Sequence, residues 1–439
     1  MSATRVVVIG GGLAGIAAAL QAADRGAEVV LLERQARLGG LTWSFRRHGL
    51  WFDNGHHIFL RCCTAYRGLL DRLGVATLTC LQERLELPVL SPNGTYTAIR
   101  RSGLPAPLHL ARSLLTYGHL SLTDRIRSGR AALSMRKLDP ADPKLDEIAL
   151  GQWLESHGQG DRAIEALWDL IALPTLNLHA SSVSLALAAM VFKTGLLDSA
   201  NAGDIGWSRV PLAHLHGDPA IAALEKAGVE VLLRTPAESV STPKAGSGRF
   251  QVALRRSSGD IQADRVVVAT SPQRAAKLLP AVRSPAFARL GTSAVVNIQL
   301  VLDRKVMDFP FAGVVDSPVQ FVFDRTDSSG LRRGQFLTIS LSAADSYMRE
   351  SQSHLVSSFS NALEELFPAM RHARILDAVV TRERHATFRA APGSAALRRA
   401  PVDWPDGVSL AGAWCDTGWP ATMESAVRSG VRAVREVLS

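Results

Sequence analysis

The side chains best suited to proton transfer occur in two short segments near opposite ends of the chain. His56 and His57 follow Asp53-Asn54-Gly55, and Asp416 and Glu424 belong to a segment that begins at Leu410. Imidazole and carboxyl groups exchange protons in enzymes, so His57, His56, Asp416 and Glu424 are the candidate acids. Each has a structural alternative. Neighbouring histidines often only hydrogen-bond, and a glutamate in the first turn of a helix can favour the helix dipole without doing chemistry.

Three aromatic residues lie beside these candidates. Phe59 follows the histidine pair, and Trp414 and Trp419 flank Asp416. Aromatic faces stabilise a cation and exclude water, so these three are the candidate substrate-binding residues. The alternative for the two tryptophans is packing against a cofactor. The four cysteines have no zinc-ligand spacing, so the sequence predicts no metal site.

A glycine-rich turn near the N-terminus predicts a dinucleotide site. Residues 10–15 match G-x-G-x-x-G, follow the apolar run 6–9 and open an alanine-rich helix over 16–23. Gly10 permits the tight turn, Gly12 lets a pyrophosphate approach the backbone, and Gly15 lets helix and strand pack closely. The helix N-terminus adds N–H donors. A second strand over 28–32 brings Glu33 to the ribose, where its charge disfavours a 2′-phosphate.

A second pair of glycines follows Glu33. Arg37-Leu38-Gly39-Gly40-Leu41-Thr42 supplies small residues and a cation that can pass close to the same pyrophosphate. NAD and FAD share the first glycine turn, but this double site resembles the amine oxidase and carotenoid desaturase superfamily of flavoproteins. The resemblance implies FAD as a non-covalent cofactor.

Further segments resemble the same superfamily. Residues 53–59 look like its D-x-G-x-H segment, which passes near the flavin, and residues 266–272 look like its intermediate strand. Residues 410–426, with Ser429-Gly430, look like its C-terminal motif, in which a helix N-terminus faces the flavin pyrimidine. The resemblance implies these cofactor-binding residues: Gly10, Gly12, Leu13, Ala14, Gly15, Glu33, Arg34, Arg37, Gly39, Gly40, Leu41, Thr42, Gly55, His56, Ala237, Thr270, Gly412, Asp416, Thr422, Met423 and Ala426.

Within the superfamily, residues 55–67 and the pattern Asp-Thr-Gly-x-Pro-x-Thr-x-Glu at 416–424 look most like the hydroxysqualene dehydroxylases. Many superfamily members carry an acidic residue directly after the Ala-Gly pair. Ala413 stands there in this chain, so Asp416 is the acidic residue expected to contact the cofactor instead.

The resemblance implies a reaction in squalene and hopanoid biosynthesis. A C30 allylic alcohol, hydroxysqualene, would lose water to give a delocalised cation, and reduced FAD would supply a hydride that yields squalene. Functional coupling to the enzyme that makes hydroxysqualene is expected. Two alternatives stay open: a carotenoid or phytoene-type desaturase, and a polyisoprenoid-binding protein that retains FAD without catalysis. The amine oxidase branch commonly uses a lysine on a substrate-lobe strand, and residues 293–300 contain none.

Charge and apolar residues combine in the stretch 100–137. The chain has a net charge of +9, and this stretch joins nine leucines and isoleucines, among them Leu104, Leu108, Leu110, Leu114, Leu115, Leu120 and Ile126, to eight arginines and lysines, opposed only by Asp124. A basic amphipathic helix can lie in the headgroup layer of an anionic membrane, where a C30 hydrocarbon resides. The alternative is a solvated basic face over an ordinary core. We find no nucleic-acid-binding module and no apolar run of membrane-spanning length, so we expect a cytoplasmic protein held peripherally at the inner membrane face.

The elements that must position these groups do not fall into two sequential blocks. Strands are predicted at 229–234, 249–254, 265–269, 294–302, 319–323, 335–341 and 408–411, with helices over much of 104–200, over 351–366 and at the C-terminus. We therefore predict an α/β fold in which a Rossmann-like FAD-binding lobe of the amine oxidase type (1–85, 205–285 and 400–439) is interleaved with a substrate lobe of mixed sheet and helices (86–204 and 286–399).

Overall fold

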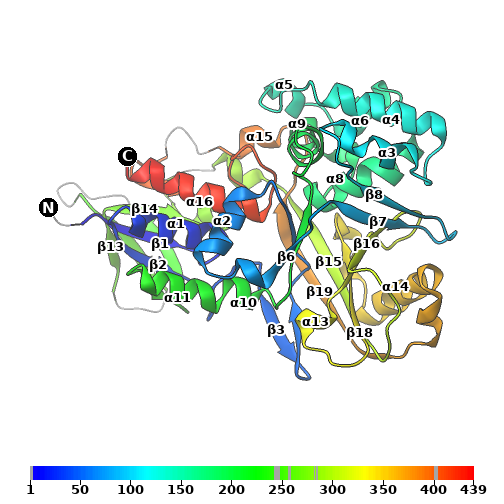
Figure 1. Ribbon diagram of the computed structural model, residues 1–439. Coiled ribbons are helices and arrows are strands. Elements are labelled where there is room, and N and C mark those ends of the chain that lie inside the picture. Colours follow the sequence, from blue (N-terminus) through cyan, green and yellow to red (C-terminus); the bar gives the residue numbers. More distant parts are fainter. Residues whose placement is uncertain (1–2, 242–247, 256–258, 281, 283–284, 400–403) are drawn as a thin grey trace.

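The chain folds into two lobes joined by several crossings of the backbone (Figure 1). The structure is a computed structural model that describes residues 3–241, 248–255, 259–280, 282, 285–399 and 404–439. Both termini lie in the first lobe (Figure 1). The second lobe carries a large sheet with helices on either side.

A parallel sheet is the centre of the first lobe. Its order is β10-β2-β1-β14-β20, so segments from distant parts of the chain lie side by side. The strands are β1 (Arg5–Ile9), β2 (Glu28–Leu32), β10 (Glu230–Leu232), β14 (Arg265–Val268) and β20 (Val408–Leu410). The three central strands are buried along most of their length, which explains why each reads as an unbroken apolar run. All five strands lie within the ranges assigned to the FAD lobe.

Helices cover one face of this sheet. They are α1 (Leu13–Asp24), α2 (Thr64–Arg72), α10 (Ala213–His216), α11 (Asp218–Lys226) and α16 (Met423–Val437). Helices α1 and α16 approach closely because Gly430 has no side chain: a Cβ there would lie 2.1 Å from the carbonyl oxygen of Ala14. The other face carries a small antiparallel sheet of β11 (Ala237–Ser241), β12 (Phe250–Leu254) and β13 (Ile261–Ala263), followed by α12 (Pro272–Leu278).

A seven-stranded mixed sheet is the centre of the second lobe. Its order is β19-β15-β18-β17-β16-β7-β8. The strands are β7 (Glu86–Leu90), β8 (Tyr96–Arg100), β15 (Thr292–Leu302), β16 (Phe311–Val314), β17 (Phe321–Asp324), β18 (Gln335–Leu341) and β19 (Ile375–Phe388). Helices α13 (Thr326–Ser329) and α14 (Gln352–Leu366) belong to this lobe. The expected strands at 294–302 and 335–341 are present, whereas β19, the longest strand described, was not predicted.

A group of helices packs against this sheet and lies above it in the view of Figure 1. It comprises α3 (Ala111–Leu115), α4 (Leu122–Met135), α5 (Pro143–Asp146), α6 (Leu150–Ser156), α7 (Asp161–Ala163), α8 (Asp169–Leu176) and α9 (Leu185–Phe192), with α15 (Ser394–Leu397) nearby. This agrees with the helical pattern predicted for 104–200. Among the described residues, no helix combines the length and the apolar character needed to cross a bilayer.

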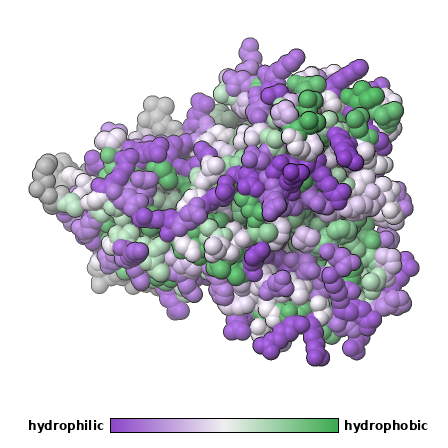
Figure 2. All heavy atoms as spheres, in the orientation of Figure 1, coloured by the Kyte–Doolittle hydropathy of each residue, from purple (hydrophilic) through white to green (hydrophobic). Residues whose placement is uncertain are grey.

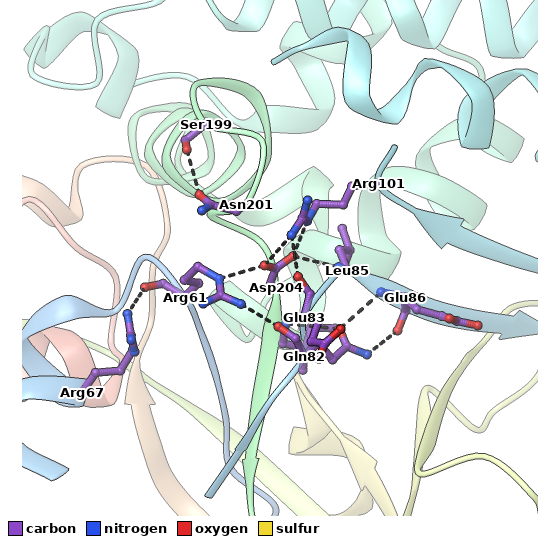
Figure 3. A network of polar contacts seen from close by, with 11 residues as sticks. Arg61, Arg67, Gln82, Glu83, Leu85, Glu86, Arg101, Ser199, Asn201 and Asp204 are labelled. Atoms are coloured by element: carbon purple, nitrogen blue, oxygen red, sulfur yellow. Dashed lines mark hydrogen bonds and ion pairs between the residues drawn. The ribbon is translucent and has the colours of Figure 1, made fainter. Parts of the chain in front are cut away.

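Two small sheets connect the lobes: β3 (Ser44–Arg47) with β4 (Leu50–Asp53), and β5 (Ile58–Leu60) with β9 (Ile205–Ser208) and β6 (Thr79–Leu81). A buried carboxylate holds this region together (Figure 3). Asp204 accepts hydrogen bonds from Arg61 Nε at 2.8 Å, from Arg101 Nε at 2.6 Å and from the backbone N–H of Leu85 at 2.7 Å. Burial alone would raise the pKa of Asp204, but the two guanidinium groups lower it, so the carboxylate stays ionised.

Candidate active site

The glycine-rich segment that joins β1 to α1 requires glycine at Gly10, in the turn, and at Gly15, in the first turn of the helix. Gly10 has φ +113°, and a Cβ there would lie 2.2 Å from the carbonyl oxygen of Ala269. A Cβ on Gly15 would lie 1.8 Å from the carbonyl oxygen of Gly10. These glycines therefore serve the packing of β1, β14 and α1, as their spacing predicts.

Gly12 is different, because nothing in the protein crowds it. The nearest atom to a Cβ at Gly12 would be Gly40 Cα, at an ordinary 3.7 Å. Gly12 is the N-cap residue of α1, with extended φ and ψ and no side-chain cap, so the first N–H groups of the helix, at Leu13 and Ala14, have no capping side chain. Gly12 and Gly40 lie close together at the positive end of the helix, since a Cβ on Gly40 would lie 2.9 Å from Gly12 Cα; with Leu13 they form what we call the glycine cradle.

Glu33 follows β2 and is buried. Its Oε2 accepts the N–H of Gly11 at 2.7 Å, and its Oε1 accepts the N–H of Gln35 at 2.7 Å. Each carboxylate oxygen keeps a further lone pair that can accept from a ribose hydroxyl. The neighbouring Arg34 is exposed.

The second glycine pair forms a loop against the first turn. The N–H of Gly39 donates to Gly11 O at 2.9 Å, and Thr42 Oγ1 donates to Gly39 O at 2.7 Å. The Arg37 guanidinium lies 4.3 Å from the centroid of the Trp43 ring and donates to Gly40 O. Burial lowers the pKa of Arg37, and the charge of Glu33 partly offsets this. Leu41 is exposed at the tip of the loop.

The C-terminal motif meets the same edge of the sheet. The N–H of Gly412 donates to Ser429 Oγ on α16 at 2.8 Å, and Thr422 caps α16 by accepting the N–H of Ser425. Met423 and Ala426 occupy the first turn of α16 and are partly buried. Thr270 follows β14 beside Gly10. Ala237 begins β11 and accepts a hydrogen bond from Arg274.

Two of the expected acids have other partners. Glu424 is fully buried; its two oxygens accept the N–H groups of Ala65 at 3.1 Å and Tyr66 at 2.8 Å, and Arg428 pairs with it at 2.6 Å. This carboxylate therefore caps α2 across the lobe. Asp416 directs its carboxylate to Arg399 at 3.6 Å and to the N–H of Gly418. These contacts argue against a proton-donor role for either residue.

The three expected aromatic side chains lie mainly within the protein. Trp414 is buried, donates from Nε1 to Thr270 O at 2.8 Å and packs on Phe287. Phe59 is buried, packs edge-on against Tyr66 and fills the space over Gly206. Trp419 is partly buried beneath the Arg428 guanidinium. Packing accounts for all three, so their expected role in a substrate wall has no support from these contacts.

The histidine pair lies where the two lobes meet. His56 stacks on Phe323 of β17, with ring centroids 3.7 Å apart. Neither ring nitrogen of His56 has a hydrogen-bond partner among the described residues, although both are buried. His57 donates from Nδ1 to Gly55 O at 3.0 Å. Burial lowers the pKa of both imidazoles, and the charge of Arg325 lowers both further, so each ring is neutral near pH 7.

Three polar residues belong to the surroundings of this pair: Asp53, which the sequence identified only as part of a motif, and Arg325 and Asn297, which it missed. Asp53 and Arg325, each 7% exposed, form a buried ion pair between β4 and the end of β17. Asn297 of β15 donates to Asn54 O at 3.4 Å, and its Oδ1 has no partner in the described part of the chain. These residues come from strands far apart in the sequence, and only the sheet order brings them together.

A further histidine lies under the second glycine loop. His216 is fully buried, and its Nε2 lies 2.9 Å from the Tyr66 hydroxyl. A Cβ on Gly39 would lie 3.5 Å from the Cβ of His216. Burial, together with the charge of His57, lowers the pKa of His216 to about 3. The sequence gives one clue, two histidines within the short segment 211–216, and that pattern is too common to single out.

FAD fits this arrangement of residues. The cradle at Gly12, Leu13 and Gly40 would take the pyrophosphate, and Glu33 would take the ribose. The unpaired ring nitrogens of His56 and the unpaired Oδ1 of Asn297 lie at the lobe junction, where buried polar atoms need a ligand or water.

Comparisons with known proteins agree with this geometry. Residues 13–438 match the family model for flavin-containing amine oxidoreductases. The chain is 29% identical to a hydroxysqualene dehydroxylase of Rhodopseudomonas palustris, in an alignment that covers 99% of this chain and 98% of that protein. It is 26% identical, over the full length of both proteins, to a hydroxysqualene dehydroxylase of Zymomonas mobilis. A zeta-carotene desaturase of Arabidopsis thaliana is 24% identical over 98% of this chain and 84% of its own length.

Solved structures share the fold. An engineered putrescine oxidase superposes with a TM-score of 0.74 at 19% identity over 99% of this chain and 98% of its own. A cyclohexylamine oxidase of Brevibacterium oxydans gives 0.71 at 19% identity over 99% of both chains. The predicted α/β fold, the FAD cofactor and the resemblance to hydroxysqualene dehydroxylases are thereby confirmed. With its glycine cradle, ribose-binding carboxylate and interleaved lobes, the chain belongs to the flavin-containing amine oxidoreductase family and is an FAD-dependent oxidoreductase.

Proposed function

We propose that this oxidoreductase reductively dehydroxylates a C30 allylic alcohol, hydroxysqualene, to squalene. The relatives with that activity in their names match the chain from end to end, which supports the reaction class. Because such a substrate dissolves in the bilayer, we propose that the chain works at the inner face of the cytoplasmic membrane, coupled to the enzyme that makes hydroxysqualene.

The observation that carries this proposal is the environment of His56. Its ring stacks on Phe323, and Phe311 and Phe321 lie beside Phe323, with ring centroids about 6 Å apart. This aromatic wall is apolar, yet both nitrogens of His56 are buried and unpaired among the described residues. A substrate hydroxyl can satisfy one of them, whereas a pure hydrocarbon leaves both unsatisfied at a cost of about 1–3 kcal/mol. This favours an alcohol over a polyene.

The residues around the wall have distinct tasks. Reduced FAD supplies the hydride when bound. His56, neutral near pH 7, orients the leaving hydroxyl through a hydrogen bond and does not itself act as a cationic acid. The faces of Phe311, Phe321 and Phe323 exclude water and stabilise positive charge as the C–O bond breaks. The hydroxyl would leave with the C–O electron pair and take up one proton to become water. The hydride and proton of FADH2 would balance the reaction, so that the alcohol and FADH2 give hydrocarbon, water and FAD.

The direction of electron flow separates this reaction from its rivals. Photoreduced holoprotein is mixed anaerobically with hydroxysqualene, and flavin absorbance and squalene are followed together. We expect one squalene formed for each flavin oxidised. Zeta-carotene desaturases among the relatives make desaturation the second candidate, and it predicts instead that oxidised flavin is reduced by a carotenoid. Retained flavin that reacts with neither compound would indicate a binding protein.

A matched pair of variants tests His56. His56→Phe keeps the stacked ring and removes the polar atoms, so it should retain FAD and lower dehydroxylation about 10²-fold, the loss expected when a reacting group is misplaced. His157→Phe is the control, because His157 also stacks on an aromatic ring, Trp153 at 3.8 Å, but its Nδ1 already donates to Trp153 O. Equal turnover by the two variants would remove His56 from the mechanism.

A further inference from the structure

Large hydrophobic side chains are exposed together along one part of the helical group. Of the eleven strongly exposed large hydrophobic residues in the described ranges, six lie between 104 and 133, and each is 46–61% exposed. They are Leu104, Leu108, Leu115, Leu122, Ile126 and Leu133. Single exposed leucines are ordinary on protein surfaces, but a group of this size within 30 residues is not. Figure 2 shows hydrophobic side chains gathered at the upper right, over the region of α4.

Helix α4 presents this apolar surface as a stripe. Leu122, Ile126 and Leu133 are separated by four and seven residues, a spacing that places them on one face of a helix. Ser128 and Met135 lie on the opposite face and are buried against the protein. The helix therefore exposes an apolar stripe to solvent, whereas an ordinary surface helix buries its apolar side chains.

Unpaired cations border the stripe. Arg112, Arg127, Arg130 and Lys137 are exposed, and none of them forms an ion pair with another described residue. Asp124, the one acidic residue of the stretch 100–137, accepts a hydrogen bond from Ser121 Oγ at 2.6 Å at the start of α4. The surface thus combines apolar side chains with uncompensated positive charge.

The inner side of the same segment reaches the aromatic wall. Tyr117 and Leu120, between α3 and α4, are buried in one cluster with Phe311, Phe321 and Phe323. Tyr117 is fixed there by a hydrogen bond from its hydroxyl to Ala166 O at 2.5 Å. One short segment therefore connects the exposed stripe to the residues beside His56.

We infer that the surface formed by α3, α4 and the preceding loop, which we call the α3–α4 face, docks onto an anionic lipid bilayer. Leucine and isoleucine side chains would enter the acyl boundary while the bordering cations contact lipid phosphates. A second copy of the chain is a poorer occupant, because a two-fold contact through this face would bring the same four cations against each other. Docking itself does not depend on the proposed function. Only the idea that it brings the substrate to the wall rests on that function.

Flotation of the FAD-bound protein with vesicles tests the inference. The vesicles contain phosphatidylcholine alone or with about 30 mol% phosphatidylglycerol, at about 0.15 M salt. We expect the wild-type protein to float with the anionic vesicles and at least about tenfold less with the neutral ones. The triple variant Leu122→Ser/Ile126→Ser/Leu133→Ser should lose at least about tenfold of the anionic binding. Arg127→Glu/Arg130→Glu should lose binding to anionic vesicles only.

A matched control uses exposed apolar residues elsewhere. Ile375 and Leu376 of β19 are 38% and 58% exposed and lie outside this face, so Ile375→Ser/Leu376→Ser should float as the wild-type protein does. Flavin absorbance and melting temperature verify that every variant is folded. The inference is overturned if wild-type protein stays unbound, if the triple variant floats unchanged, or if a concentration-dependent dimer that the triple variant abolishes replaces vesicle binding. Failure here leaves the anaerobic turnover assay unaffected.

Discussion

Gly12→Ala should separate the stability of the fold from the binding of FAD. A Cβ at Gly12 meets only Gly40 Cα, at 3.7 Å, so the substitution creates no clash within the protein. Alanine restricts the unfolded chain and stabilises the fold by about 0.4–1 kcal/mol at a compatible position. Because Gly12 is an N-cap, where glycine is preferred to alanine, a loss of up to about 1 kcal/mol opposes this gain. The net change in unfolding free energy is expected within about 1 kcal/mol of zero.

FAD binding should respond much more strongly. The added methyl group lies at the N-terminus of α1, beside the N–H groups that the pyrophosphate must approach. Loss of one charge-assisted hydrogen bond costs about 1.5–3 kcal/mol, which corresponds to roughly 10- to 150-fold weaker binding. Titration of the apoprotein with FAD, followed by quenching of flavin fluorescence, measures the affinity, and urea unfolding of the apoprotein measures the stability.

Gly15→Ala provides the contrast. Its Cβ would lie 1.8 Å from the carbonyl oxygen of Gly10, so the main effect is on folding. We expect the free energy of unfolding of the apoprotein to fall by several kcal/mol, or no folded apoprotein at all. The reasoning fails if Gly12→Ala binds FAD as tightly as the wild type, or if it destabilises the apoprotein as severely as Gly15→Ala does.

Three further predictions concern buried charge. Asp53→Asn and Arg325→Met should each lower the free energy of unfolding by about 3–5 kcal/mol, because either leaves a buried charge unpaired. The double variant should lose less than the sum of the two, and additive losses measured by urea unfolding would contradict this. The pKa of His216 falls from 6.5 to about 3 on folding, so below pH 6.5 the unfolded chain binds a proton that the fold excludes. Stability should therefore decline from pH 6.5 towards pH 3 by about 1.4 kcal/mol per unit for this residue, and His216→Gln should flatten the urea-midpoint profile correspondingly. Glu424→Gln should lower the free energy of unfolding by about 1–2 kcal/mol, because it weakens the cap of α2, and it should retain turnover. A loss of rate above about 10²-fold would make Glu424 a proton donor after all.

The sequence predicted best what is local and buried. The strands at 6–9, 28–32 and 265–269 are apolar runs, and Gly10, directly after the first, is required because a Cβ there would lie 2.2 Å from the carbonyl oxygen of Ala269. Strand β19 was missed because most of its residues are only partly buried, and its charged residues interrupt the apolar alternation along a sheet edge. Its length comes from pairing with β15, which no local pattern reveals.

Candidate catalytic groups were harder to predict because their chemistry depends on distant partners. Glu424 has the residue type of an acid, but α2 packs across the start of α16 and uses both carboxylate oxygens. Trp414 and Phe59 lie beside motif residues in the sequence, yet their side chains pack into the cores of the FAD lobe. The aromatic wall instead comes from β16 and β17, which carry no recognisable motif.

The buried environment of His56 makes it a poor proton donor and, at the same time, a selective hydrogen-bonding group. A solvent-exposed His56 would be a plausible acid, but burial and the nearby Arg325 guanidinium disfavour its charged form. Removing that guanidinium while keeping the apolar wall should therefore raise the pKa of His56. A neutral imidazole whose two nitrogens lack partners is a poor acid and a selective hydrogen-bonding group, since any ligand that cannot pair with it pays for the desolvation. The Asp53–Arg325 pair thus links β4 to the end of β17, and its guanidinium group helps to keep the His56 imidazole neutral. Under the proposed function, that neutral imidazole would distinguish an alcohol from a hydrocarbon.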